Sequence, residues 1–350
     1  FTGLESKRVV VLRKCHNTIT TYRRRNMKSA TLKLSCSVLV ACCVGLGLPA
    51  QAQQWPVKPV RIIVPFAAGG GTDIQGRLLG KKFFESLGQS FVVDNRPGAS
   101  GIIGVELAAK SPADGYTMLF VSASMSVNVT LYGKRMTVDP RKDLVPVSWI
   151  SSVPLVLVIH PSVPVKNVKE LVALARKTGK MNGAHNGAGT TSHLSLEMLQ
   201  QMAGIKVAGI PYKGGGPAGT ALISGEVDFA FATGLNAQPM IKAGRIKALA
   251  VTTKKTSPAF PGVPTMDSLY PGFESDNWYG MFFPAGTAAD IVTKMNGEIV
   301  KAIKSKEVSD FMSKEGATPV GSTPDALAAQ LRAEIDRYAK VIKAANIKTD

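Results

Sequence analysis

The sequence predicts an α/β protein with two lobes. From Trp55 onward, short apolar strands alternate with amphipathic helices, which is the pattern of an α/β fold with a largely parallel sheet. Two proline-flanked apolar segments, "WISSVPLVLVIHPSVPV" and "NWYGMFFPAGT", interrupt this alternation. Pro154, Pro161 and Pro164 favour a connection between lobes over a central strand for the first segment. Because α/β material lies on both sides of each segment, we expect a discontinuous first lobe, 55–155 plus 277–350. A continuous second lobe, 156–276, is inserted into it.

Two segments at the beginning of the chain are not expected to belong to this fold. Residues 1–26 are predicted to be an upstream extension, non-native or untranslated, because they offer no pattern that a core could use. Residues 27–52 are typical of a signal peptide, with Lys28 and Lys33 before an apolar run and the small-x-small site Ala50-Gln51-Ala52 after it. The apolar run is too short for a comfortable membrane span of about 20 residues. We therefore expect export to the periplasm and a mature chain that begins near Gln53.

Cysteine raises one alternative to this export route. The stretch that ends at Cys42 resembles a bacterial lipobox, which would leave an acylated Cys42 as the first residue of a lipid-anchored protein. The sequence after Cys43 stays apolar instead of forming a polar tether, and this speaks against the anchor. All four cysteines precede the Ala52 site, so a disulfide framework, a thiolate nucleophile and a zinc-thiolate centre are excluded for the mature chain.

Length and charge bound the remaining possibilities. Cleavage after Ala52 leaves 298 residues, and two domains are the prior for that length. The mature chain keeps 33 basic and 23 acidic residues, a net charge of +10. These charges are scattered, without an Arg-rich arm, so we expect no nucleic-acid partner. Either the charge is an ordinary solvated surface, or it is a field that attracts organic anions.

The first strand–helix unit carries the glycine-rich stretch "PFAAGGGTDI", residues 65–74. Val60 to Pro65 read as a strand, and the helix after the glycines is expected to begin at Thr72, which has capping-box spacing to Gln75. The loop matches neither a P-loop nor a dinucleotide-binding pattern. Taken alone, it is either a tight turn without a ligand or an anion site.

A second loop of the same kind, "NGAGTTSH", favours the anion reading. Gly187 and Gly189 let the backbone approach a ligand closely, and Thr190, Thr191 and Ser192 supply hydroxyls where the next helix begins. The unpaired N–H groups and the dipole of such a helix terminus attract anions. No acidic residue follows at the distance that a dinucleotide site requires.

The other elements follow in order along the chain. We expect strands in "FVV", "YTMLFVS", "VDFAFAT" and "IKALAVTT", a helix after the Asn95 to Gly101 turn, and a hydroxyl-rich loop in "SASMS". Asn167 is placed to cap a helix, and two amphipathic helices should close the chain. A third glycine turn, "PYKGGGPAG", holds Lys213, either an ordinary exposed lysine or a cation near the cleft.

Enzyme signatures are missing from the sequence. There is no G-x-S-x-G elbow, and His185 and His193 do not have a common zinc spacing. For His193 we expect a helix N-terminal donor packed against the loop instead of a metal ligand. The sequence therefore predicts no catalytic residues, no metal and no cofactor.

Several motifs in order resemble one family. They are "VRIIVPFAAGGGTDI", "DNRPGASGIIG", "DGYTML", "NGAGTTSHL", "IPYKGGGPA", "GEVDFAFAT", "IKAGRIKALAVTT" and "FPAGT". From Trp55 to the C-terminus the chain resembles the Bug (TctC-like) family, the periplasmic solute-binding proteins of tripartite tricarboxylate transporters. The resemblance implies the two-lobe periplasmic-binding-protein, or Venus flytrap, fold, with each lobe a mostly parallel sheet flanked by helices.

It also implies a non-catalytic, monomeric receptor that holds a small carboxylate by main-chain amides, hydroxyls and waters. Its partners would be the membrane components of the transporter, or a sensor kinase. Ala67-Ala68 departs from the family pattern and leaves the ligand open. The implied ligand-binding residues are Ala68, Gly69, Gly70, Gly71, Thr72, Asp73, Ser122, Ser124, Gly187, Ala188, Gly189, Thr190, Thr191, Ser192 and His193. An exported α/β enzyme acting on a carboxylate substrate and a lipid-anchored ligand sensor remain as alternatives.

Overall fold

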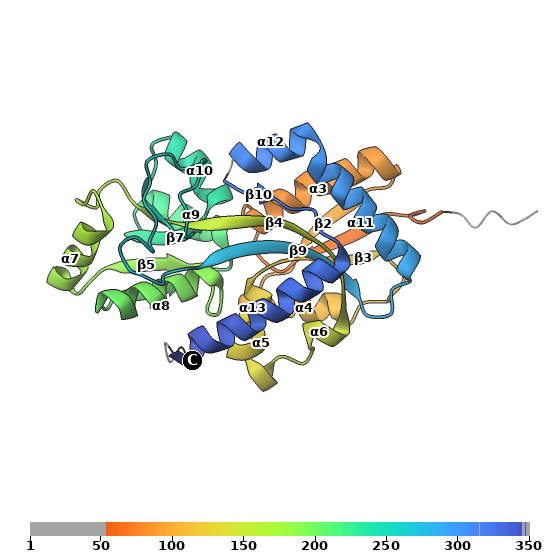
Figure 1. Cartoon of the computed structure of the whole chain (residues 1–350), viewed down its shortest axis with the longest axis horizontal. Helices are drawn as coiled ribbons and strands as arrows, with labels where there is room; N and C mark the ends of the chain where they lie inside the picture. Colours follow the sequence, from red (N-terminus) through yellow and green to blue (C-terminus); the bar gives the residue numbers. More distant parts are fainter. Residues whose placement is uncertain (1–53, 315, 345–346, 348–350) are drawn as a thin grey trace, which may run out of the picture. The chain divides into compact units, whose positions relative to one another are not determined.

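The computed structural model of the protein describes residues 54–314, 316–344 and 347. The predicted extension 1–26, the predicted signal peptide 27–52, Cys42 and Gln53 lie outside the described residues. The elements described below all belong to the unit Trp55–Asp350 (Figure 1).

In the described part of the chain, ten strands form one mixed sheet in the order β2-β1-β3-β9-β4-β7-β5-β6, with β10 and β8 also paired to β4. The outer strands pair in parallel: β1 with β2 and β3, and β5 with β6 and β7. β4 and β9 pair antiparallel with each other and with their other neighbours. The predicted parallel pairing is therefore found among the outer strands and not at β4 and β9. The strands are β1 (Val60–Val64), β2 (Phe91–Asn95), β3 (Thr117–Ser122), β4 (Leu144–Ile159), β5 (Asn182–His185), β6 (Ala208–Pro211), β7 (Phe229–Thr233), β8 (Lys247–Val251), β9 (Asp276–Pro284) and β10 (Thr318–Pro319).

The long strands β4 and β9 contain most of the two proline-flanked segments and run side by side through the unit (Figure 1). Predicting "WISSVPLVLVIHPSVPV" as a connection instead of a central strand was wrong. Pro146 is tolerated because it lies at a shift in the β4–β9 register, where the ladder is interrupted. Pro154 is the last β4 residue paired with β9, and Leu155 is the first paired with β7. The prolines therefore mark points where the pairing changes.

Helices cover both faces of the sheet. The helices are α3 (Gly71–Leu87), α4 (Ile102–Ala109), α5 (Ser124–Leu131), α6 (Pro140–Asp143), α7 (Val168–Thr178), α8 (Thr191–Ala203), α9 (Gly215–Ser224), α10 (Gly234–Lys242), α11 (Ala289–Lys304), α12 (Lys306–Lys314) and α13 (Pro324–Ala344), with 3-10 turns η1 (Ala99–Gly101) and η2 (Gly133–Arg135). Along β1, Ile62 packs with residues of α3 and α11, whereas Ile63 packs with residues of α4 and α13. This alternation follows from the two-residue period of a strand.

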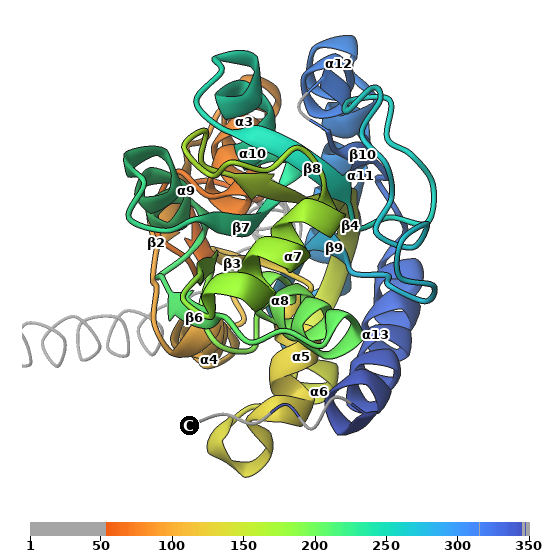
Figure 2. The same ribbon diagram turned by 90° about the vertical axis from the view of Figure 1, so that its left-hand side faces the viewer.

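The same arrangement recurs around the far half of β4. Leu157 belongs to the core that includes α7 and α8, and Val158 belongs to the core that includes α9. Figure 2 looks onto this end of the unit, where α7 and α8 lie on one side of the strands and α9 and α10 on the other. The sheet thus separates two cores at each end, and the loops at the strand ends are left to meet in the middle.

Most of the other predicted elements are confirmed, with two further corrections. "SASMS" is not a loop, because α5 begins at Ser124, and three helices instead of two close the described chain because α12 separates α11 from α13. Asn167 does cap α7, accepting a hydrogen bond from the Glu170 N–H.

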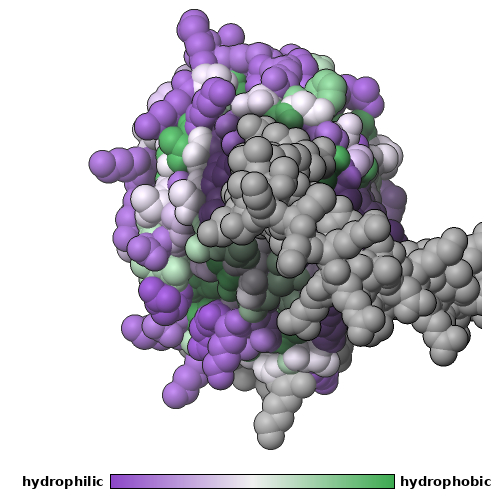
Figure 3. Space-filling view, turned by 90° about the vertical axis from the view of Figure 1, so that its right-hand side faces the viewer, coloured by the Kyte–Doolittle hydropathy of each residue, from purple (hydrophilic) through white to green (hydrophobic). Residues whose placement is uncertain are grey.

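Hydrophilic side chains lie around the edge of the molecular face that Figure 3 shows. Among the described residues, every helix is too short or too polar to span a membrane.

Candidate functional site

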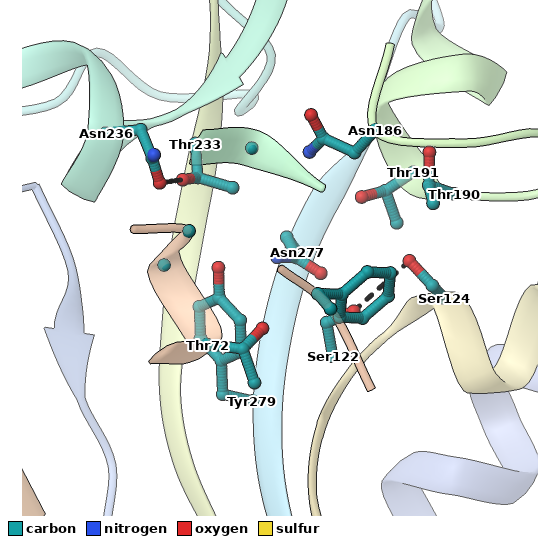
Figure 4. A pocket seen from close by; sticks show the side chains of 14 residues that line it. Thr72, Ser122, Ser124, Asn186, Thr190, Thr191, Thr233, Asn236, Asn277 and Tyr279 are labelled. Atoms are coloured by element: carbon teal, nitrogen blue, oxygen red, sulfur yellow. Dashed lines mark hydrogen bonds between the residues drawn. The ribbon is translucent and has the colours of Figure 1, made fainter. Parts of the chain in front are cut away.

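A polar cavity lies where five helices begin. α3, α8 and α9 contribute their first residues, Gly71, Thr191 and Gly215, while α5 contributes Ser124 and α10 its N-cap Thr233. The hydroxyl and amide groups of the side chains labelled in Figure 4 lie around one space. The lining residues are Phe66, Gly70, Gly71, Thr72, Ser122, Ser124, Asn186, Thr190, Thr191, Gly215, Thr233, Asn236, Asn277 and Tyr279.

The lining suits an anion although it contains no cation. None of the 14 lining residues carries a formal charge at neutral pH. The first N–H groups of a helix have no partner inside the helix, and the helix dipole places partial positive charge at that end. Five such termini around one space offer neutral donors in fixed positions, which is the chemistry that holds carboxylate or phosphate groups.

The first glycine loop supplies one wall of this cavity. α3 begins at Gly71 after the extended N-cap Gly70, which makes no side-chain capping bond. The predicted capping box is therefore wrong, because Thr72 already lies inside the helix and Gln75 accepts a hydrogen bond from the Ser151 hydroxyl at 2.8 Å. A Cβ at Gly71 would lie 2.3 Å from the Tyr279 phenol oxygen, so the buried Tyr279 would have to move to admit a side chain there.

Asp73 does not line the cavity. Its carboxylate turns back onto its own loop, where it accepts hydrogen bonds from the Gly69 N–H and the Asn95 amide at 3.0 Å each and pairs with Arg77 at 2.9 Å. Burial raises the pKa of this carboxyl, but the bonds from Arg77, Gly69 and Asn95 outweigh burial and lower it. Asp73 therefore stays ionised and braces the loop instead of facing the cavity.

Ala68 and Gly69 do not line the cavity, and they contact α9 and α10 instead. The Gly69 carbonyl accepts a hydrogen bond from the Asn236 amide at 2.8 Å. The Ala68 carbonyl lies against Gly216 of α9. A main-chain bond of 2.9 Å from the Ala67 N–H to the Lys213 carbonyl completes this contact.

The second glycine loop lines the cavity through Asn186, Thr190 and Thr191. Thr190 caps α8, and its hydroxyl donates to the Gly187 carbonyl at 2.7 Å. Ser192 accepts from the Asn186 N–H at 2.8 Å and is fully buried, so it fixes the loop without lining the cavity.

His193 and Gly189 stabilise the same loop without lining the cavity. The His193 Nδ1 accepts a hydrogen bond from the Gly189 N–H at 3.2 Å, and the His193 main-chain N–H donates to the Thr190 hydroxyl at 3.4 Å. Burial, with a smaller contribution from His185, lowers the pKa of His193 to about 4. The two histidine rings lie 4.6 Å apart, and no group of three potential ligands among the described residues could hold a metal ion.

Sequence reasoning missed half of the lining. The residues it did not name are Phe66, Asn186, Gly215, Thr233, Asn236, Asn277 and Tyr279. "FATGLN" repeats the strand–glycine–helix pattern of the first two loops, so Thr233 and Asn236 could have been found by the same signal. Asn277 and Tyr279 could not, because they lie inside β9, which carries no such signal. Gly187, Ala188 and the exposed Lys213 line a neighbouring cavity that shares Phe66 and Asn186 with this one.

Tyr279 and Asn277 form the floor of the cavity. Tyr279 is fully buried, and burial raises the pKa of its phenol although hydrogen bonds with Thr233, Asn277 and Thr72 oppose the shift. It therefore remains a neutral hydroxyl at any physiological pH. The Asn277 side-chain oxygen is buried and has no hydrogen-bond partner among the described residues, so a hydrogen-bond donor beside it would be favoured.

Comparison with known proteins decides the family. The protein-family model described as "Tripartite tricarboxylate transporter family receptor" matches residues 76–347 of the chain. The chain belongs to this receptor family. It is 39% identical over 313 residues to Protein BugT of Bordetella pertussis, covering 87% of this chain and 94% of BugT.

Solved structures of similar proteins agree. The periplasmic binding protein BugD matches with a TM-score of 0.82 at 33% identity, covering 85% of this chain and all of BugD. R. palustris Rpa4515 with adipate matches with a TM-score of 0.81 at 36% identity, covering 84% of this chain and 99% of that one. The resemblance to the Bug family and the two-lobe fold are thereby confirmed. Because members of this family are receptors and not enzymes, the alternative of an exported enzyme is not supported.

Proposed function

We propose that the protein is a periplasmic receptor that binds one small carboxylate-containing anion in this cavity and delivers it to a tripartite-type membrane transporter. The observation that carries the proposal is the convergence of five helix N-termini on a space without a formal charge. A carboxylate there would accept hydrogen bonds from first-turn N–H groups and from hydroxyls. Adipate, the molecule bound in Rpa4515, belongs to this chemical class.

The binding residues are, in this proposal, the predicted residues that line the cavity together with those found in the structure. Thr191 is the most informative of them, because its hydroxyl makes no hydrogen bond within the described residues, whereas the Thr190 hydroxyl is engaged by its own loop. Thr191 is therefore free to donate to a ligand.

Residues 55–155 with 277–350 would move as one lobe and 156–276 as the other. The change of β4 partner between Pro154 and Leu155 supports this boundary. Walls of the cavity come from both sides of it, since Thr72 and Ser124 belong to one proposed lobe and Thr191 and Thr233 to the other. Ligand would then favour the closed arrangement.

Native mass spectrometry tests the ligand class. Protein purified without refolding should retain a small acid, and calorimetry with that acid should show one site per chain. Retention of a neutral or cationic compound, together with no heat from any carboxylate in a broad panel, would contradict the proposal.

Mass spectrometry of the mature N-terminus tests export. A chain that begins near Gln53 in the periplasmic fraction is expected. A diacylated Cys42 would support the lipid-anchored form, and a cytoplasmic chain that keeps Lys28 would contradict export.

A further inference from the structure

α7, in the second proposed lobe, has one apolar face and one face of exposed cations. The apolar face is buried, with Val168, Leu171, Val172 and Ala175 in the core that α7 shares with α8. Figure 1 places α7 at one end of the unit, and Figure 2 looks onto that end. The exposed cations of this end, here called the basic face, are Lys166, Lys169, Arg176, Lys177, Lys180 and Lys206.

The fold gathers these six side chains on one side of the lobe. Lys169 lies seven and eight residues before Arg176 and Lys177, a spacing that repeats on one face of a helix. Two more cations flank the helix, one residue before its N-cap and one residue after its C-cap. The Arg176 guanidinium donates a hydrogen bond to the Ala203 carbonyl, which holds the end of α8 and the following turn with Lys206 beside α7.

Carboxylates do not neutralise the basic face. None of its six cations forms an ion pair with a described acidic side chain. Glu170, the one acidic residue of α7, is engaged at the start of the helix. It accepts hydrogen bonds from the Lys166 main-chain N–H and the Asn167 amide at 2.8 Å each. The charge of the face is therefore directed towards solvent.

Other exposed helices of the chain pair their cations with acids. On α3 Lys82 pairs with Glu85 at 2.8 Å, and on α12 Lys306 pairs with Asp310 at 2.8 Å. Such pairs stabilise an exposed helix face, whereas like charges at the same spacing destabilise it. The helix dipole does not account for the difference, because Lys169 lies in the first turn of α7, where a cation is unfavourable. The unpaired cations therefore indicate an anionic partner.

The composition of the basic face favours a lipid surface over a protein as this partner. Protein interfaces are enriched in aromatic residues and Arg and depleted in Lys. Five of the six cations are lysines, and neither 162–181 nor 200–207 contains an aromatic residue. Lysine is a compact, strongly hydrated charge, which suits diffuse attraction to a layer of phosphate headgroups. None of the six cations lines the cavity at the helix ends or its neighbour, so the face does not serve ligand binding.

We propose that the basic face binds the surface of a bilayer that contains anionic phospholipids. The contact is electrostatic and reversible, and it weakens as salt screens the charges. A receptor held in this way searches for its transporter along the membrane instead of through the whole periplasm. The inference goes beyond the proposed function and does not depend on which ligand the cavity binds.

Sedimentation with lipid vesicles tests this contact. Purified mature protein is mixed with vesicles of equal parts phosphatidylglycerol and phosphatidylcholine, and with vesicles of phosphatidylcholine alone. Mass spectrometry first verifies that the chain carries no acyl group, because an acylated chain would bind both kinds of vesicle. Two triple variants are compared with the unmodified protein: Lys169→Gln/Lys177→Gln/Lys180→Gln on the basic face, and Lys142→Gln/Lys304→Gln/Lys314→Gln at exposed lysines of α6, α11 and α12.

The unmodified protein should bind the vesicles with phosphatidylglycerol at low salt, dissociate as salt rises, and leave phosphatidylcholine vesicles unbound. The basic-face variant should bind about tenfold to a hundredfold more weakly, because each cation near an anionic surface contributes about fivefold. The α6/α11/α12 variant has the same net charge and should lose much less. Arg at positions 169, 177 and 180 should retain binding. Calorimetry with the co-purified acid should give unchanged affinity in all variants, which verifies folding.

An equal loss in the two triple variants would overturn the inference, because binding would then follow net charge instead of the basic face. Equal binding to the two kinds of vesicle would overturn it as well, since the contact would not be electrostatic. If the unmodified protein binds no phosphatidylglycerol vesicles at low salt, the inference fails and an acidic protein is the remaining class of partner. In each case the proposed function stands, because ligand binding tests it separately.

Discussion

Gly216→Ala tests whether the arrangement seen here is the ligand-bound one. Gly216 is the second residue of α9 and faces the loop that precedes α3. A Cβ on Gly216 would lie 2.3 Å from the Ala68 carbonyl oxygen and 3.2 Å from the Gly69 carbonyl carbon, while real Cβ contacts essentially never fall below 3.0 Å. Both neighbours are backbone atoms, so no flexible side chain can move aside. α9 and the loop would have to separate.

The free-energy cost of the added Cβ can be judged from the typical cost of overpacking a protein interior. Extra methyl groups in a packed contact typically cost about 1–3 kcal/mol. Because the contact joins the two proposed lobes, this cost falls on the closed form and leaves the open form alone. The affinity for ligand should then fall by about fivefold to 150-fold, at about 1.4 kcal/mol per factor of ten. Separation would also stretch the bond from the Asn236 amide to the Gly69 carbonyl, so the upper part of this range is expected.

Calorimetry with the co-purified acid measures the effect, and Pro217 requires a control. A residue before proline resists the helical conformation once it carries a Cβ, which would strain Gly216→Ala in the open and closed forms alike. The matched comparison is therefore Gly216→Ala/Pro217→Ala against Pro217→Ala alone. Gly297→Ala, where nothing lies within 4 Å of the added Cβ, controls for the general effect of alanine in a helix. An affinity for Gly216→Ala/Pro217→Ala within about twofold of Pro217→Ala alone would refute the reasoning, because the clash would then not oppose binding.

Three further outcomes are expected. Thr191→Val should weaken binding by about tenfold to a hundredfold in calorimetry, since a hydrogen bond to a charged group contributes about 1.5–3 kcal/mol; unchanged affinity would remove Thr191 from the site. Small-angle scattering should give a smaller radius of gyration with ligand, and an identical profile at saturation would argue against lobe closure. The free energy of unfolding should fall as the pH drops from about 6.5 to 4. In that window the unfolded chain binds more protons, because the pKa of His193 is about 4 in the folded protein and about 6.5 in the unfolded chain. His193 accounts for at most about 3 kcal/mol of this fall. His193→Asn keeps an acceptor for the Gly189 N–H but cannot titrate. Its free energy of unfolding, measured by chemical denaturation, should therefore change less with pH than that of the unmodified protein. An equal change with pH in the two proteins would count against His193 as the source.

The two glycine loops could be predicted because their signals are local. A strand, a glycine turn and a helix in direct succession are enough to place an anion-binding helix terminus, and this predicted Gly71, Thr72, Thr190 and Thr191 as residues near a ligand. The same local reasoning could not say which side chains in the loop turn inward. Ser192 follows Thr191 directly, yet it bonds to the Asn186 N–H behind the loop. Only the course of the backbone after the glycines separates the two.

The missing half of the lining is non-local. Tyr279 faces the cavity because β9 pairs with β3 at Ser122 and with β4 at Ser151, and that pairing joins segments more than a hundred residues apart. Pro154 inside β4, with Pro161 and Pro164 after it, hid the strand itself, because the change of pairing partner at Pro154 cannot be seen in a sequence. Tyr279 and Asn277, the floor of the cavity, therefore could not be predicted from any short stretch of sequence.

The division of the donors between the lobes connects affinity to motion. α3 and α5 belong to one proposed lobe and α8, α9 and α10 to the other, so neither lobe alone surrounds an anion with donors. A lysine or arginine in the cavity would hold a carboxylate on one lobe whether or not the other approached. With only neutral helix termini, full binding requires both lobes, and the ligand shifts the equilibrium by as much as it prefers the closed form. Contacts such as Asn236 to Gly69 and Tyr132 to Ala188 then set how readily the closed form exists without ligand. Weakening either contact should lower affinity even for ligands that never touch it.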